Sequence, residues 1–170
     1  MFQLFLAILP TIVIVTYILK FDHYHKEPSS LLVRLFFLGC LSVIPAIILE
    51  TILLPDTISG RFIPLFLYST LGIGGIEEGV KIFMVFICGY KHHAFDEIYD
   101  GIIYCVMVSL GFATIENIMY VMQFGTQTAL LRMFTAVPAH AIFAISMGYY
   151  IGLSKAYPAK KEYYLILSYV

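Results

Sequence analysis

Two adjacent glutamates, Glu77 and Glu78, interrupt an apolar stretch that runs from about residue 62 to residue 90, and Lys81 follows them. A charged side chain at the centre of a bilayer costs at least about 3 kcal/mol. Carboxylates kept at that cost are expected to do chemistry, and a water-accessible glutamate is what a general base for hydrolysis needs. The structural alternative is a Glu–Lys pair that only locks helices together.

Helical spacing predicts how these three side chains are arranged. Glu77 and Lys81 share one helix face, whereas Glu78 lies about 100° further round the helix. One carboxylate would therefore face a cavity while a neighbouring polar group holds the other. Gly74 and Gly75 would allow a second helix to approach closely, or the helix to break locally.

Later apolar stretches carry further polar groups, Glu116 with Asn117 and then His140. Tyr120 stands one turn after Glu116 on the same expected helix. A lone histidine on an apolar helix is usually a packed, hydrogen-bonded residue. His140, however, shares its expected depth in the membrane with both glutamate-bearing helices, which favours a functional role.

Acidic residues also begin the fourth apolar stretch, at Asp96, Glu97 and Asp100. In the first turn of a helix they satisfy free N–H groups and the helix dipole. Asp100 and Glu116 are separated by about 24 Å along an unbroken helix, so they should not share a site. We expect Asp100 to reach Lys81 instead.

The composition indicates a membrane protein. The 170 residues are 61% hydrophobic and 12% charged, against about 25% charged in soluble domains. We expect an all-α, polytopic bundle of transmembrane helices that forms a single integral membrane domain over residues 1–170. It would have five full spans and the start of a sixth, with the C-terminus truncated or incomplete. The expected spans are 2–20, 33–54, 63–90, 98–124, 130–153 and an incomplete 163–170.

The charge pattern predicts an orientation and excludes some partners. Basic residues gather in the odd-numbered loops, at Lys26, Lys91 and Lys160, whereas the second loop offers Arg61 alone. The odd loops should therefore be cytoplasmic and the N-terminus outside. A net charge of -1 gives no basic surface for nucleic acid, so the lipid bilayer is the expected environment. The oligomeric state stays open.

Motifs narrow the chemistry. The chain has neither the H-E-x-x-H pair of zincin proteases nor the G-x-S-x-G of a serine elbow. The order of its polar motifs resembles the PrsW family of bacterial intramembrane proteases. The matching segments are EEGVK at 77–81, FDEIYDGIIY at 95–104, LGFATIENIMY at 110–120, Arg132, and VPAH at 137–140.

The resemblance implies an activity and a set of site residues. The family is distantly similar to the CAAX prenyl protease and bacteriocin-immunity superfamily. The resemblance implies an enzyme of the bacterial cell membrane that makes the site-1 cut in a single-span anti-sigma factor during envelope stress. The residues carried over with most weight are Glu77, Glu78, Glu116 and His140. The resemblance gives a lower weight to four further site residues, Lys81, Asp96, Asp100 and Asn117.

Several mechanisms and functions remain open from the sequence. The favoured mechanism is hydrolysis by a water that Glu77 or Glu78 activates, with His140 and Asn117 stabilising the oxyanion or protonating the leaving amine. No cofactor is favoured, but a Zn²⁺ ion held by Glu77, Glu116 and His140 is the runner-up. The alternative functions are a proton-coupled transporter or channel and a non-catalytic scaffold or immunity protein.

Overall fold

The computed structural model describes residues 2–21, 26–55 and 62–169, which form helices joined by turns and contain no strand. The helices are α1 Phe2–Lys20, α2 Ser29–Leu53, α3 Phe62–Leu67, η1 Tyr68–Gly74, α4 Gly75–Cys88, α5 Ile98–Phe124, α6 Thr126–Phe134, α7 Ala136–Ala156, η2 Pro158–Lys160 and α8 Lys161–Leu167. Arg61 and Val170, both used in the sequence predictions, lie outside the described residues.

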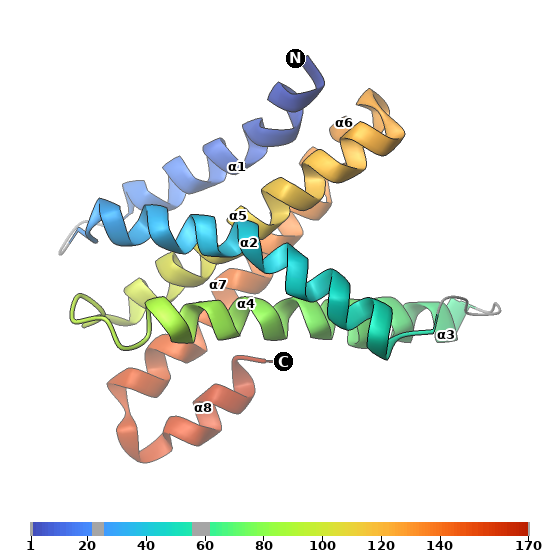
Figure 1. The fold of residues 1–170 in the computed structure, drawn as a ribbon. Helices are drawn as coiled ribbons and strands as arrows, with labels where there is room; N and C mark the ends of the chain where they lie inside the picture. The colour runs from blue at the N-terminus through green and yellow to red at the C-terminus, as the bar shows by residue number, and fades with distance from the viewer. Residues whose placement is uncertain (1, 22–25, 56–61, 170) are drawn as a thin grey trace.

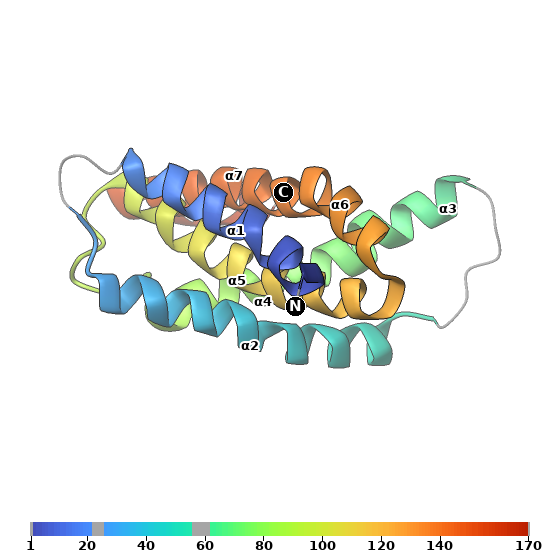
Figure 2. The ribbon, with the colours of Figure 1, turned by 90° about the horizontal axis from the view of Figure 1, so that it is seen from above.

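Helix α5 is the centre of the bundle, and α1, α2, α4, α6 and α7 all pack against it (Figure 1, Figure 2). Glycines let the helix backbones touch. A Cβ added to Gly111 of α5 would lie 2.1 Å from the carbonyl oxygen of Phe36 on α2, and one added to Gly148 of α7 would lie 2.4 Å from that of Gly101 on α5. Such close backbone contacts are typical of helix packing in membranes, where apolar burial alone gives no driving force.

Four stretches of helix are long and apolar enough to cross a membrane. They are Phe2–Lys20, Ser29–Leu53, Ile98–Phe124 and Thr126–Ala156. The all-helical class and the multi-pass character are therefore confirmed, whereas the predicted count of five spans and the start of a sixth is not.

The expected span 63–90 is three consecutive helical segments, α3, η1 and α4, and each of them is short. The middle segment, Tyr68–Gly74, follows the wider π-helical pattern of backbone hydrogen bonds. Such segments are rare and occur frequently at functional sites. The two glutamates follow this segment directly, in the first turn of α4, so the change of helical pattern sets the direction in which they point.

The last two expected spans also differ from the structure. Thr135 separates α6 from α7, so the helical region around 130–153 consists of two helices. The expected span 163–170 begins inside the seven-residue α8, Lys161–Leu167, which packs beside α7. The chain then returns toward α4, where the hydroxyl of Tyr169 donates a hydrogen bond of 2.8 Å to the carbonyl of Gly75.

Candidate active site

Lys81 lies at the centre of the polar groups inside the bundle. Its side chain is 1% exposed, and its ammonium contacts Glu77 Oε2 at 3.3 Å, Glu78 Oε1 at 2.8 Å and His140 Nδ1 at 3.0 Å. The ammonium also lies 4.1 Å from the centre of the Phe112 ring. An ammonium has three N–H donors, and here each has an acceptor. The predicted contact between Lys81 and Asp100 is therefore wrong.

Glu77, Glu78 and His140 form a compact group of ligand atoms. One atom from each residue lies within 4.8 Å of the other two. All three residues line a cavity of about 600 Å³ between α4 and α7, together with Ser69 and Thr70 of the π-helical segment. Glu78 Oε2 is buried without a hydrogen-bond partner in the described structure. An acceptor left free at such a site can receive a proton or bind a cation.

His140 connects this group to a second one on its other side. His140 Nε2 lies 2.9 Å from Glu116 Oε2, and the Glu116 carboxylate forms an ion pair with Arg132, whose Nη2 lies 2.8 Å away. Lys81 and Glu116 therefore contact opposite nitrogens of the imidazole. The structure thus gathers Glu77, Glu78 and His140, and it leaves Glu116 outside the group that was predicted to share a metal ion.

Asn117 and Tyr120 support the second group without reaching the first. The Asn117 side chain is completely buried, donates to the carbonyl of Ala7 at 2.8 Å and accepts from Arg132 Nε at 3.0 Å. The Tyr120 ring lies under the guanidinium of Arg132, 4.1 Å from Cζ. The amide of Asn117 is therefore already paired and does not point into the cavity as an oxyanion donor.

Asp96 and Asp100 lie at the start of α5, far from the cavity. Asp100 Oδ2 accepts hydrogen bonds from the backbone N–H groups of Asp96 at 2.9 Å and Glu97 at 2.7 Å. Together with Glu97 it forms a capping box. The predicted capping role is confirmed, and the geometry gives these residues no contact with the groups around Lys81.

Arg132 is among the segments that match the family in the sequence, but the sequence assigns it no role in the site. The structure shows that its side chain is 13% exposed and contacts three residues of α5. Those residues are Glu116, Asn117 and Tyr120. The presence of an arginine and a glutamate in neighbouring apolar stretches was a signal that the two could form an ion pair. Whether Arg132 reaches Glu116, however, depends on the turn at Thr135 between α6 and α7.

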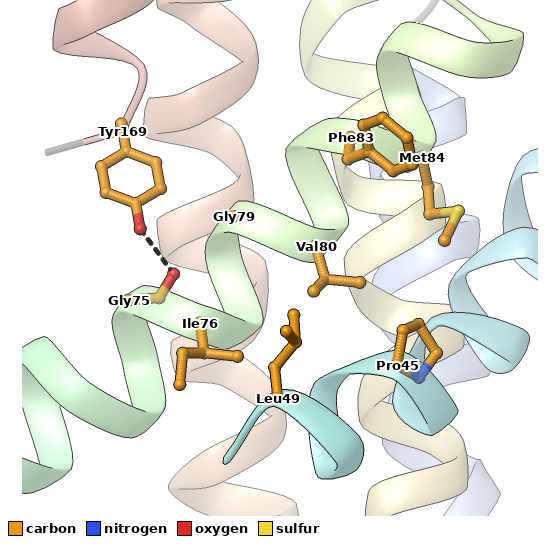
Figure 3. Close-up of a pocket in the computed structure, with 9 residues that line it drawn as sticks. All are labelled: Pro45, Leu49, Gly75, Ile76, Gly79, Val80, Phe83, Met84 and Tyr169. Carbon is orange, nitrogen blue, oxygen red and sulfur yellow. Dashed lines mark hydrogen bonds between the residues drawn. The ribbon is translucent and has the colours of Figure 1, made fainter. Parts of the chain in front are cut away.

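An apolar cavity of about 420 Å³ lies beside the polar one, between α2 and α4. Figure 3 shows Pro45 and Leu49 of α2 facing Ile76 and Val80 of α4, with the Tyr169 hydroxyl bonded to Gly75 at one edge. Gly75 and Tyr169 also line the polar cavity. The two cavities therefore meet at the contact between the C-terminal segment and the first turn of α4.

The comparison with known proteins identifies the family. The family model described as PrsW family intramembrane metalloprotease matches residues 27–169. The chain belongs to the PrsW family. Protease PrsW of Geobacillus kaustophilus is 39% identical over 172 aligned residues, which cover 100% of this chain and 75% of that protein. Protease PrsW of Bacillus subtilis is 38% identical over 149 residues, covering 88% and 67%. No solved structure matches the chain.

Membership of the PrsW family confirms two predictions. The chain is a peptidase, and it is a multi-pass membrane protein with several long apolar helices. For a PrsW peptidase, the cavity that holds Glu77, Glu78 and His140 is the candidate active site. In this cavity of the described structure, the carboxylates of two glutamates and the imidazole of a histidine lie close together.

Proposed function

We propose that this chain is an intramembrane endopeptidase that cuts a single-span membrane protein, in the class of membrane-anchored anti-sigma factors, in the bacterial cell membrane. The observation that carries the proposal is the meeting of Glu77, Glu78 and His140 within 4.8 Å in one cavity. The substrate class rests on the resemblance of the motifs at 77–81, 95–104 and 110–120. The transporter and scaffold alternatives lose their support because the relatives are proteases.

The chemistry assigns a separate task to each group. Glu78, whose Oε2 has no partner, accepts the proton of a water as its oxygen adds to the scissile carbonyl carbon. The buried Lys81 ammonium supplies positive charge for the oxyanion that forms. As the C–N bond breaks, the leaving nitrogen takes a proton from the protonated carboxyl group. Glu77 and His140 hold Lys81 in place.

The family description names a metalloprotease, and the donor set fits a divalent cation. Glu77, Glu78 and His140 offer three O and N ligand atoms, and Glu78 Oε2 is unpaired. These residues would hold the ion, which would supply a Lewis acid and an activated water. Lys81 contacts the same three groups, so an ion there would compete with its ammonium.

The test is cleavage of a tagged single-span anti-sigma substrate by purified protein in detergent. Wild type should cut it, and Glu77→Gln, Glu78→Gln and His140→Ala should each lose about 10²- to 10⁴-fold in rate while staying folded. Glu162→Gln, an exposed carboxylate on α8, is the matched control and should cut normally. A zinc chelator then separates the two mechanisms. Undiminished cleavage by Glu77→Gln and Glu78→Gln would contradict the proposal.

A further inference from the structure

The guanidinium of Arg132 is held by three residues of α5 although it belongs to α6. Its Nε donates to Asn117 Oδ1 at 3.0 Å, its Nη2 lies 2.8 Å from Glu116 Oε2 as an ion pair, and its Cζ lies 4.1 Å above the Tyr120 ring. Asn117 in turn is tied to the backbone of Ala7 on α1. Nη2 makes no hydrogen bond of regular geometry in the described structure, so its contact with Glu116 is one of charge. A planar guanidinium that donates a hydrogen bond to Asn117, pairs with the Glu116 charge and stacks on Tyr120 has one orientation, which a lysine cannot reproduce.

The same Glu116 oxygen that meets Arg132 also meets His140. A carboxylate only accepts hydrogen bonds, so His140 Nε2, 2.9 Å from Glu116 Oε2, must carry a proton. On the other side of the ring, Lys81 only donates, so His140 Nδ1, 3.0 Å away, must present its lone pair. The partners on both sides therefore select one neutral tautomer.

We propose that Arg132 is a positioning residue of the peptidase. Through Glu116 it holds the His140 ring in the tautomer and orientation that turn Nδ1 toward Lys81, the ammonium that Glu77 and Glu78 also contact. The inference rests on the proposed function, because it concerns the same cavity. Without the guanidinium, Glu116 has neither a counter-charge nor a fixed rotamer, and His140 Nε2 has no fixed acceptor. Partners of this kind typically contribute 10- to 100-fold to activity or metal affinity.

The kinetic test compares Arg132→Gln and Arg132→Lys with Arg34→Gln, an exposed arginine on α2 outside both cavities. We expect kcat to fall about 10- to 100-fold in both Arg132 variants with KM little changed, since Arg132 does not line the cavity. Arg34→Gln should keep wild-type kinetics. Adding Glu116→Gln to Arg132→Gln should cost no more than Glu116→Gln alone, because the two residues act as one unit.

A second measurement needs no substrate. In metal-free protein labelled with ¹⁵N-histidine, the His140 signals are those missing from His140→Gln. We expect wild type to show the tautomer protonated at Nε2, and Arg132→Gln to show a mixture of tautomers. Wild-type tautomers in Arg132→Gln, together with additive effects of Arg132→Gln and Glu116→Gln on kcat, would overturn the inference and leave Arg132 a purely structural role.

The design separates failure of this inference from failure of the proposed function. If folded wild type cuts no single-span substrate, the proposed function fails, but the ¹⁵N spectra still decide the role of Arg132. If both Arg132 variants prove unfolded, Tyr120→Leu replaces them, because it removes the ring beneath the guanidinium and keeps every hydrogen bond. A partial shift of the His140 tautomer in that variant supports the inference, and an unchanged tautomer contradicts it.

Discussion

Lys81 Nζ lies 3.0 Å from His140 Nδ1, which joins α4 to α7 inside the bundle. The ammonium is surrounded by Glu77, Glu78 and the imidazole, and it is almost inaccessible to solvent. A buried cation is stable in such a place only when acceptors satisfy it, and the carboxylates in turn need its charge. Lys81 is therefore the counter-ion that allows two glutamates and a histidine to face one another.

Replacing Lys81 should expose that dependence. Lys81→Met keeps an unbranched side chain, one atom shorter, but leaves the Glu77 and Glu78 carboxylates without their cation. We expect a loss of about 3–5 kcal/mol in folding stability, the cost typical of a buried charge whose partner is removed. Thermal unfolding in detergent measures this loss. Zinc should restore part of the stability in Lys81→Met, because a divalent ion can neutralise the same carboxylates.

Lys160→Met, at an exposed position, is the matched control and should unfold like wild type. Equal stability of Lys81→Met and wild type, without added metal, would show that the ammonium is not the counter-ion of the glutamates.

The grouping of ligand atoms predicts which residues hold a metal ion, should the peptidase use one. Glu78→Gln and His140→Ala should lose stoichiometric zinc binding, measured by competition with a chromophoric chelator, because each removes a ligand atom. Glu116→Gln should still bind one ion, with affinity lowered about 10- to 100-fold, because Glu116 contacts only the far nitrogen of His140. Loss of stoichiometric binding in Glu116→Gln would instead support the set of Glu77, Glu116 and His140.

The backbone contact between α5 and α7 should be intolerant of the smallest side chain. In Gly148→Ala the new Cβ would lie 2.4 Å from the carbonyl oxygen of Gly101, so the two helices must separate. We expect a loss of about 1–3 kcal/mol in stability, seen as a lower thermal midpoint. Gly74→Ala meets a neighbour only at 3.5 Å and serves as the control. A Gly148→Ala midpoint equal to that of Gly74→Ala would contradict the packing described here.

Composition was sufficient to predict the helical class, because an uncharged run in hydrocarbon must satisfy its own backbone groups. It was not sufficient to predict the helix boundaries. The π-helical turn before Gly75 and the break at Thr135 add no charge and barely change the hydropathy, so a search for apolar runs passes over both. These two irregularities nevertheless determine where Glu77 and Arg132 point.

Helix arithmetic predicted that Glu116 and His140 lie at similar depths, and in the structure they are in contact. Depth alone, however, does not say which imidazole nitrogen meets which carboxylate. That choice depends on the rotation of α7 about its axis, which its contacts with α5 set, and on Arg132 reaching back from α6. The catalytic roles of Glu77, Glu78 and His140 stay predictions until they are measured.

The acidic start of α5 allows stability to be separated from catalysis. Asp100 caps the backbone N–H groups of Asp96 and Glu97, about 24 Å along α5 from Glu116. Asp100→Ala should therefore lower stability by about 0.5–2 kcal/mol and leave kcat of the folded enzyme near the wild-type value. Thermal unfolding and cleavage assays on the same preparation measure both. A fall in kcat of tenfold or more at unchanged stability would instead place Asp100 in the catalytic machinery, as its position in the segment at 95–104 first suggested.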